Sequence, residues 1–245
     1  MNDKKFLVLG ASSGLGREVT KCLINKGFTV IGIGRSQDKL DDLSEEIQSK
    51  KFISFPYTVS EFEEFVSNLS SLSEAHGPFD GVFNSLGEER FKSLKMIKYK
   101  DIDRIFLPLF FSSLAIIKLS FKKSFLSERG SIVLMSSVSS QSGKSGMALY
   151  ASARGAIESL VKSSAHELAS QNKRINSIRA GAVKTEMHTR LIANLSPEQI
   201  QAYENDHLLG FGETADISEI VLFLLSEKSK WITGTSIDVD GGFLA

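Results

Sequence analysis

Short apolar runs alternate with longer amphipathic stretches along most of the chain. The strand-like runs are residues 5–9, 29–33, 52–55, 81–83, 131–135, 175–179 and 236–239. The helix-like stretches between them include residues 15–26, 39–49, 61–74, 105–126, 151–170 and 215–226. Continuous apolar strands separated by helices are typical of a parallel sheet covered on both faces. The pattern therefore predicts an α/β fold, a Rossmann-type doubly wound parallel sheet of about seven strands with helices on both faces.

One segment, residues 185–211, does not follow this alternation. It has mixed polarity and contains Ser196-Pro197, a pair that favours the start of a helix. In a doubly wound fold the ligand crevice lies at the carboxyl ends of the strands, where such an insertion can cover a substrate. The chain has no internal repeat and no proline-rich linker. We therefore expect one domain, residues 1–245, with a substrate lid near 185–211.

The amino-acid composition argues against two kinds of partner, nucleic acids and membranes. Lys plus Arg equals Asp plus Glu at 29 each, so the basic excess that a general nucleic-acid binder needs is missing. The most apolar stretch, residues 105–117, is shorter than the ~20 residues that cross a bilayer. The N-terminus shows no signal-peptide pattern. We expect a cytoplasmic protein with no nucleic-acid or membrane partner.

The four histidines show no metal-ligand spacing, so no metal is expected. Two of them, His188 and His207, fall in the expected lid. There they could face a substrate, although a position on the surface is the simpler expectation.

A glycine-rich loop joins the first predicted strand to the first predicted helix. Its candidate cofactor-binding residues are Gly10, Ser12, Ser13, Gly14, Leu15 and Gly16. Glycines let the backbone turn sharply and approach a diphosphate, and the helix start offers N–H groups to the anion. An ordinary tight turn is the alternative, but the position between strand and helix favours a dinucleotide.

The sequence just after the second predicted strand indicates which dinucleotide, NAD(H) or NADP(H), the protein binds. Arg35 stands where an acidic residue would bond the ribose hydroxyl of NAD, and an arginine there suits the additional phosphate of NADP. NADP(H) is therefore favoured, with NAD(H) as the alternative. The competing interpretation of Arg35 is a solvated loop side chain.

The motifs at 10–16 and 84–87, Ser137, Tyr150 and Asp240-Gly241-Gly242 together resemble the short-chain dehydrogenase/reductase family, most closely its 3-oxoacyl-(acyl carrier protein) reductases. The resemblance covers essentially the whole chain. It implies that Ser137 holds a substrate carbonyl and that Tyr150 is the general acid. Further cofactor contacts that it implies are Val59 and Asn84 with Gly87 on the adenosine side, and Val183 and Thr185 at the nicotinamide end. It also implies a homodimer or homotetramer, paired through helices 105–126 and 151–170.

Two departures from the family pattern concern catalysis. Arg154 stands one helical turn after Tyr150, where the family has lysine, and it joins the candidate catalytic and cofactor-binding residues. Arginine keeps the positive charge that can lower a tyrosine pKa, but it does not release protons. Pro108 replaces an asparagine whose backbone carbonyl holds a relay water in the family; proline keeps the carbonyl but lacks an N–H and kinks a helix.

These residues lead to three hypotheses. The first is an NADPH-dependent reductase of a ketone, with a 3-oxoacyl thioester as the first candidate, in which Tyr150 protonates the carbonyl oxygen. The second is a catalytically weakened nucleotide-binding homologue that acts as a partner or regulatory subunit, in a hetero-oligomer with an active homologue. The third is a different reaction, such as dehydration or epimerisation, with the nucleotide in a structural role.

Overall fold

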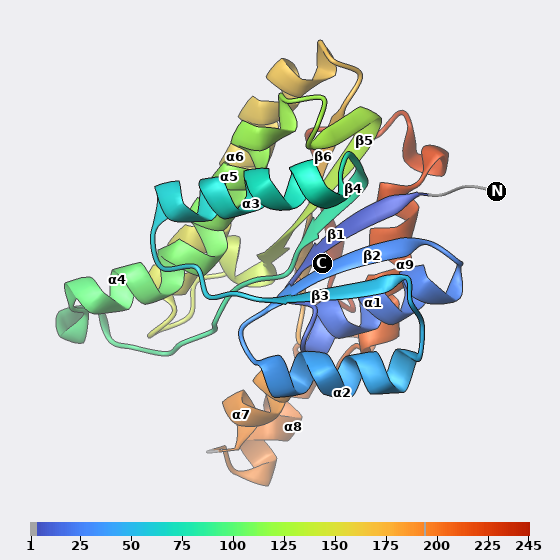
Figure 1. The fold of residues 1–245 in the computed structure, drawn as a ribbon. Coiled ribbons are helices and arrows are strands. Elements are labelled where there is room, and N and C mark those ends of the chain that lie inside the picture. Colours follow the sequence, from blue (N-terminus) through green and yellow to red (C-terminus); the bar gives the residue numbers. More distant parts are fainter. Residues whose placement is uncertain (1–3, 194) are drawn as a thin grey trace.

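The computed structural model describes residues 4–193 and 195–245, and in this part of the chain seven parallel strands form one sheet in the order β3-β2-β1-β4-β5-β6-β7 (Figure 1). The strands are β1 (Lys5–Leu9), β2 (Thr29–Gly34), β3 (Phe52–Pro56), β4 (Phe79–Asn84), β5 (Leu126–Ser137), β6 (Arg174–Ala180) and β7 (Ser236–Val239). The central strands are buried nearly throughout, which explains their continuous apolar sequences. The predicted Rossmann-type sheet is confirmed.

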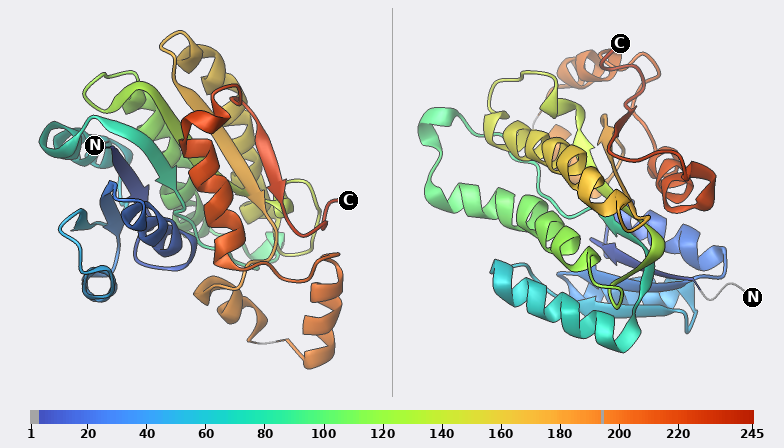
Figure 2. Two further views of the ribbon diagram at one scale, coloured as in Figure 1. Left: turned by 90° about the vertical axis from the view of Figure 1, so that its right-hand side faces the viewer. Right: turned by 90° about the horizontal axis from the view of Figure 1, so that it is seen from above.

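Helices cover both faces of the sheet. They are α1 (Gly14–Asn25), α2 (Gln37–Ile47), α3 (Phe62–His76), α4 (Tyr99–Phe106), α5 (Ser112–Ser120), α6 (Ala148–Ala169), α7 (Glu186–Ile192), α8 (Pro197–Asn205) and α9 (Thr214–Leu225). In the right-hand view of Figure 2, α3, α5 and α6 lie on one side of the sheet and α1 and α9 on the other. Each face has its own apolar core, so the fold is doubly wound as predicted.

The predicted helix over 105–126 is wrong in its continuity. α4 and α5 are separated by a π-helical turn, Leu107–Phe111, and Leu126 already belongs to β5. Pro108 has no N–H to continue the helical ladder, and the Ser112 hydroxyl donates to the Pro108 carbonyl at 2.6 Å. The kink expected from Pro108 is therefore a π-helical turn, which is wider than an α-helical turn, and the helical backbone continues through it.

The segment expected to form a lid folds into α7 and α8, which lie below the sheet in Figure 1. The predicted start at Ser196-Pro197 is confirmed, because the Ser196 hydroxyl caps α8 and Gln199 bonds back to Ser196. The Phe211 ring packs against the rings of Tyr203 and His207, and His207 also packs against Phe243, which follows β7.

The expected surface position of His188 and His207 is wrong, because only 7% and 3% of these residues are exposed. The His207 Nε2 accepts a hydrogen bond from the Ala182 N–H at 3.0 Å, and its Nδ1 donates to the Tyr203 carbonyl at 3.1 Å. His207 thus fastens α8 to the segment that follows β6. No periodic pattern in the sequence indicates this burial, because the contact depends on how the segment after β6 folds back.

None of the helices in residues 4–193 and 195–245 combines the length and the apolarity needed to span a membrane.

Candidate active site

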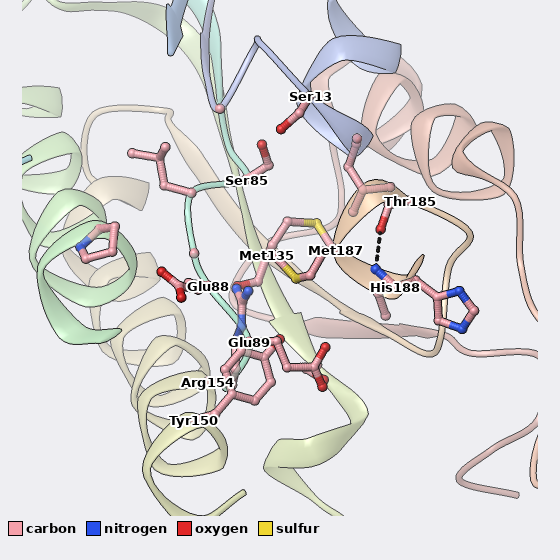
Figure 3. A pocket seen from close by; sticks show the side chains of 18 of the residues that line it. Ser13, Ser85, Glu88, Glu89, Met135, Tyr150, Arg154, Thr185, Met187 and His188 are labelled. Atoms are coloured by element: carbon pink, nitrogen blue, oxygen red, sulfur yellow. Dashed lines mark hydrogen bonds between the residues drawn. The ribbon is translucent and has the colours of Figure 1, made fainter. Parts of the chain in front are cut away.

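A cleft of about 470 Å³ opens where the carboxyl ends of the strands meet the lid. Figure 3 shows the side chains that surround it, contributed by the loop after β1, the segment after β4, β5, α6 and α7. The predicted site residues that line it are Gly10, Ser12, Ser13, Gly14, Leu15, Arg35, Val59, Gly87, Ser137, Tyr150, Arg154, Val183 and Thr185. Gly16 and Asn84 are not among its lining residues.

The glycine-rich loop fits a dinucleotide diphosphate. Gly10 has a φ of +86°, which favours glycine, and a Cβ on Gly16 would overlap the Gly10 carbonyl oxygen. Gly16 therefore acts by letting α1 approach β1 rather than by contacting a ligand. Ser13 is the N-cap of α1, yet its side chain makes no capping bond, so the first N–H groups of α1 remain available to an anion at the cleft.

Arg35 follows β2 directly and is exposed at the edge of the cleft. Its guanidinium has no hydrogen-bond or ion-pair partner among the described residues, unlike nearby Arg17, which bonds Glu46 at 2.6 Å. Since no protein group uses the guanidinium N–H donors of Arg35, all of them are available to bind a phosphate.

Asn84 lies at the end of β4 and is buried at 3% exposure. Its amide donates to the hydroxyls of Ser112 and Ser113 at 2.8 and 3.0 Å, and its side-chain oxygen accepts from the Leu86 N–H at 3.1 Å. These bonds tie the turn after β4 to the first residues of α5. Asn84 therefore supports the wall of the cleft by holding this turn in place, and it does not line the cleft itself.

Ser137 ends β5 at the mouth of the cleft. Its hydroxyl accepts from the Ser139 N–H at 3.2 Å and so caps the short helix Val138–Ser140. The backbone next to it is held by Glu158 on α6, which accepts from the Ser136 hydroxyl at 2.7 Å and from the hydroxyl of Ser140. Ser137 is therefore fixed between two anchored serines.

Tyr150 and Arg154 lie one turn apart on α6, and both are buried, at 5% exposure each. The Arg154 guanidinium carbon lies 5.1 Å from the centre of the Tyr150 ring, and Nη1 donates to the Met135 carbonyl at 2.6 Å. Its Nε is buried without a partner among the described residues. A Cβ on Gly87 would lie 2.7 Å from Arg154 Nη2, so the glycine makes room for the larger side chain.

Burial raises the pKa of the Tyr150 hydroxyl above its ordinary value, and the Glu89 carboxylate raises it further. The positive charge of Arg154 acts in the expected direction and lowers this pKa, but burial outweighs it. The phenol therefore remains protonated at neutral pH.

Pro108 lines the cleft as well, but its carbonyl oxygen already accepts from Ser112. In the family that the sequence resembles, the carbonyl at this position holds a relay water, and proline keeps that carbonyl. One of its two lone pairs is now used within the protein, which is a specific difference from the expected relay.

The side chains that line the cleft and were missed from the sequence include Glu89 and Tyr203. Glu89 could have been noticed, because the pair Glu88-Glu89 directly follows the turn at the carboxyl end of β4. Tyr203 could not have been noticed in this way, since its position depends on how the segment that contains α8 folds back.

Comparison with known proteins defines the class. The profile of the family described as enoyl-(acyl carrier protein) reductase matches residues 10–244. The 3-oxoacyl-[acyl-carrier-protein] reductase of Staphylococcus aureus is 29% identical over 242 residues, which are 98% of this chain and 97% of the relative. The L-xylulose reductase of Caenorhabditis elegans is 30% identical over 98% of this chain and 96% of its own length. A short chain dehydrogenase family protein from Francisella tularensis superposes with a TM-score of 0.87 at 28% identity, with 98% of each chain covered.

The chain belongs to the short-chain dehydrogenase/reductase family, and it is similar there to the 3-oxoacyl-(acyl carrier protein) reductases. Members of this family are oxidoreductases that use NAD(H) or NADP(H).

Proposed function

We propose that the protein is an NADPH-dependent reductase of a ketone. The observation that carries this proposal is that Ser137, Tyr150 and Arg154 line the same cleft as the glycine loop and Arg35. A dinucleotide whose diphosphate meets the start of α1 would have its nicotinamide near the segment that contains Val183 and Thr185. When bound, the nicotinamide would supply the hydride.

The protein groups have separate tasks in this proposal. The first N–H groups of α1 bind the diphosphate, and Arg35 bonds the phosphate that distinguishes NADP. The Ser137 hydroxyl donates to the carbonyl oxygen of the substrate, and the Tyr150 hydroxyl gives that oxygen its proton as negative charge develops. Arg154 stabilises the charge near Tyr150 without taking part in a proton relay.

The raised pKa of Tyr150 keeps its hydroxyl in the protonated form that the reduction requires. A phenol that stays protonated is ready to donate to a carbonyl oxygen. The opposite reaction needs a phenolate, which burial disfavours.

The relatives support a ketone as substrate. Their names give the reduction of a 3-oxoacyl group and of L-xylulose, and both of these molecules contain a ketone. A 3-oxoacyl thioester is the first compound to assay.

The test combines binding with turnover. Fluorescence titration with NADPH and NADH measures cofactor affinity, and the absorbance loss of NADPH with 3-oxoacyl thioesters measures reduction. We expect Tyr150→Phe to lower kcat by at least about 100-fold, because it removes the general acid, while NADPH affinity is unchanged. Full activity of Tyr150→Phe would show that another group supplies the proton.

A second candidate function is a partner subunit that binds the nucleotide without turnover. It is favoured by the Pro108 carbonyl that bonds Ser112 and by the Arg154 guanidinium that bonds Met135. Tight NADPH binding without any reduction, unchanged in Arg154→Lys, would support this candidate. Reduction by the wild-type protein alone would exclude it.

A further inference from the structure

Glu89 is a carboxylate at the reacting end of the cleft that the mechanism above does not use. It lies in the segment after β4 and lines the cleft together with Tyr150 and Tyr203. In Figure 3 its side chain lies beside the Tyr150 ring, and its carboxylate points toward the side on which His188 lies. The Glu89 charge raises the pKa of both tyrosine hydroxyls, which places it close to both.

The Glu89 carboxylate has no hydrogen bond or ion pair with any residue in 4–193 or 195–245. Its neighbour Glu88 differs, because Arg104 binds both Glu88 oxygens at 2.6 and 2.9 Å. Burial raises the pKa of Glu89, so its charged form lacks the stabilisation that a partner would give.

The nearby cations are bound elsewhere. Arg154 donates to the Met135 carbonyl. Lys144 lies 3.3 Å from Asp206, and its ammonium lies 4.6 and 4.8 Å from the ring centres of Tyr203 and Phe243. Both cations act on Glu89 only at longer range.

A bound substrate would strip water from this carboxylate. A ligand with only methyl or methylene groups there leaves the acceptor unpaired, which is costly, whereas a donor on the ligand replaces the lost water. Sites that hydrogen-bond a hydroxyl of the substrate discriminate strongly against analogues that lack it. Since Tyr150 would meet the carbonyl oxygen, the group that meets Glu89 must be attached close to the carbonyl carbon.

We propose that Glu89 selects ketones that carry a hydroxyl or ammonium donor beside the carbonyl, and this assignment rests on the ketone reduction proposed above. It narrows the substrate class away from ketones whose carbonyl has only hydrocarbon neighbours, the 3-oxoacyl thioesters included, and it identifies Glu89 as the residue that determines this specificity.

Pairs of ketones with equal numbers of heavy atoms test the assignment. Dihydroxyacetone is compared with diethyl ketone, and aminoacetone with ethyl methyl ketone, at saturating NADPH. The ratio of kcat/KM within each pair is measured for the wild-type protein, Glu89→Gln and Glu89→Leu. Glu128→Leu is the matched control, because Glu128 is exposed near the start of β5, at the opposite end from Ser137.

We expect the wild-type protein and Glu128→Leu to prefer the donor-bearing ketone of each pair by roughly ten- to hundredfold. Glu89→Leu should bring both ratios close to one. Glu89→Gln should keep part of the preference for the hydroxyl and lose the preference for the ammonium. A wild-type ratio near one, or a preference that survives in Glu89→Leu, would overturn the assignment.

If NADPH binds but no ketone is reduced, the proposed reduction fails while the assignment of Glu89 is still tested. The same four ketones are then titrated calorimetrically into the protein–NADPH complex. Tighter binding of the donor-bearing members that disappears in Glu89→Leu supports the assignment. Equal binding within the pairs, or no binding of any of the four, refutes it.

Discussion

Arg154 shows what can and cannot be predicted for a single residue. Its place one turn after Tyr150 predicts a positive charge beside the phenol, and the guanidinium does lie over that ring. The hydrogen bond to the Met135 carbonyl was not predictable, because the end of a long side chain goes wherever the surrounding strands leave an acceptor. Asn84 is a second example. Its type and position suggest a ligand contact, but its side-chain amide donates hydrogen bonds to Ser112 and Ser113 at the start of α5.

Cofactor preference is a prediction at the scale of one residue. Arg35→Ala should weaken NADPH binding by about ten- to hundredfold, the equivalent of a lost charge-assisted hydrogen bond. NADH binding serves as the internal control and should be unchanged, because NADH lacks the phosphate that Arg35 would bond. Equal losses for the two cofactors in fluorescence titrations would assign Arg35 a general electrostatic role.

At the scale of elements, a buried carboxylate joins the end of β5 to α6 and β6. Glu158 accepts from Gln141 at 3.0 Å and from Arg179 at 3.1 Å, in addition to the two serines that flank Ser137. Arg179 also binds Asp238 on β7, at 2.5 and 3.0 Å. The distance between Ser137 and Tyr150 is therefore controlled by a residue on the helix that carries Tyr150.

Glu158→Gln should destabilise the protein by about 1–3 kcal/mol, because an amide group would face the Gln141 amide or the Arg179 guanidinium and leave a buried donor unpaired. Turnover should fall more than NADPH affinity, since the segment that contains Ser137 loses its anchor. Thermal unfolding and steady-state kinetics measure both effects. Asp238→Asn is the matched control: Asp238 is 43% exposed, so this change should cost less stability and spare kcat. Equal effects of the two variants would argue against a positioning role for Glu158.

The sequence predicted each strand and most helices, because buried parallel strands have an unmistakable apolar pattern. It failed over 105–126, where the π turn Leu107–Phe111 is as apolar as the helix α5 that follows it. Periodicity cannot separate such segments, since the difference depends on the hydroxyls of Ser112 and Ser113 and on the missing N–H of Pro108.

At the scale of the whole molecule, the apolar residues of α5 contribute to the core. Ile116, Ile117 and Leu119 are buried within the chain, and the pairing of subunits through helices 105–126 and 151–170 stays a prediction. Exposed apolar side chains occur in the segment before α4 and in α4 itself, and this part of the chain lies on the left in Figure 1. They are Phe91, Leu94, Met96, Tyr99 and Ile102.

Exposed apolar side chains that lie close together often mark a protein–protein interface. We therefore expect the protein to form a homodimer or homotetramer, and light scattering at micromolar concentration should give at least twice the mass of one chain. Tyr99→Glu, which places a charge in this patch, should lower the mass, whereas Lys228→Glu, at an exposed position in the short helix Glu227–Ser229 after α9, should not. A monomeric wild-type protein would refute this expectation.

Gly87 and Arg154 also have an evolutionary consequence. A Cβ on residue 87 would lie 2.7 Å from the outer nitrogen of Arg154, so any larger residue at 87 would force this side chain to move. Substitutions at the two positions should therefore be coupled. Related chains from other organisms that have arginine at the position of 154 should keep glycine at the position of 87.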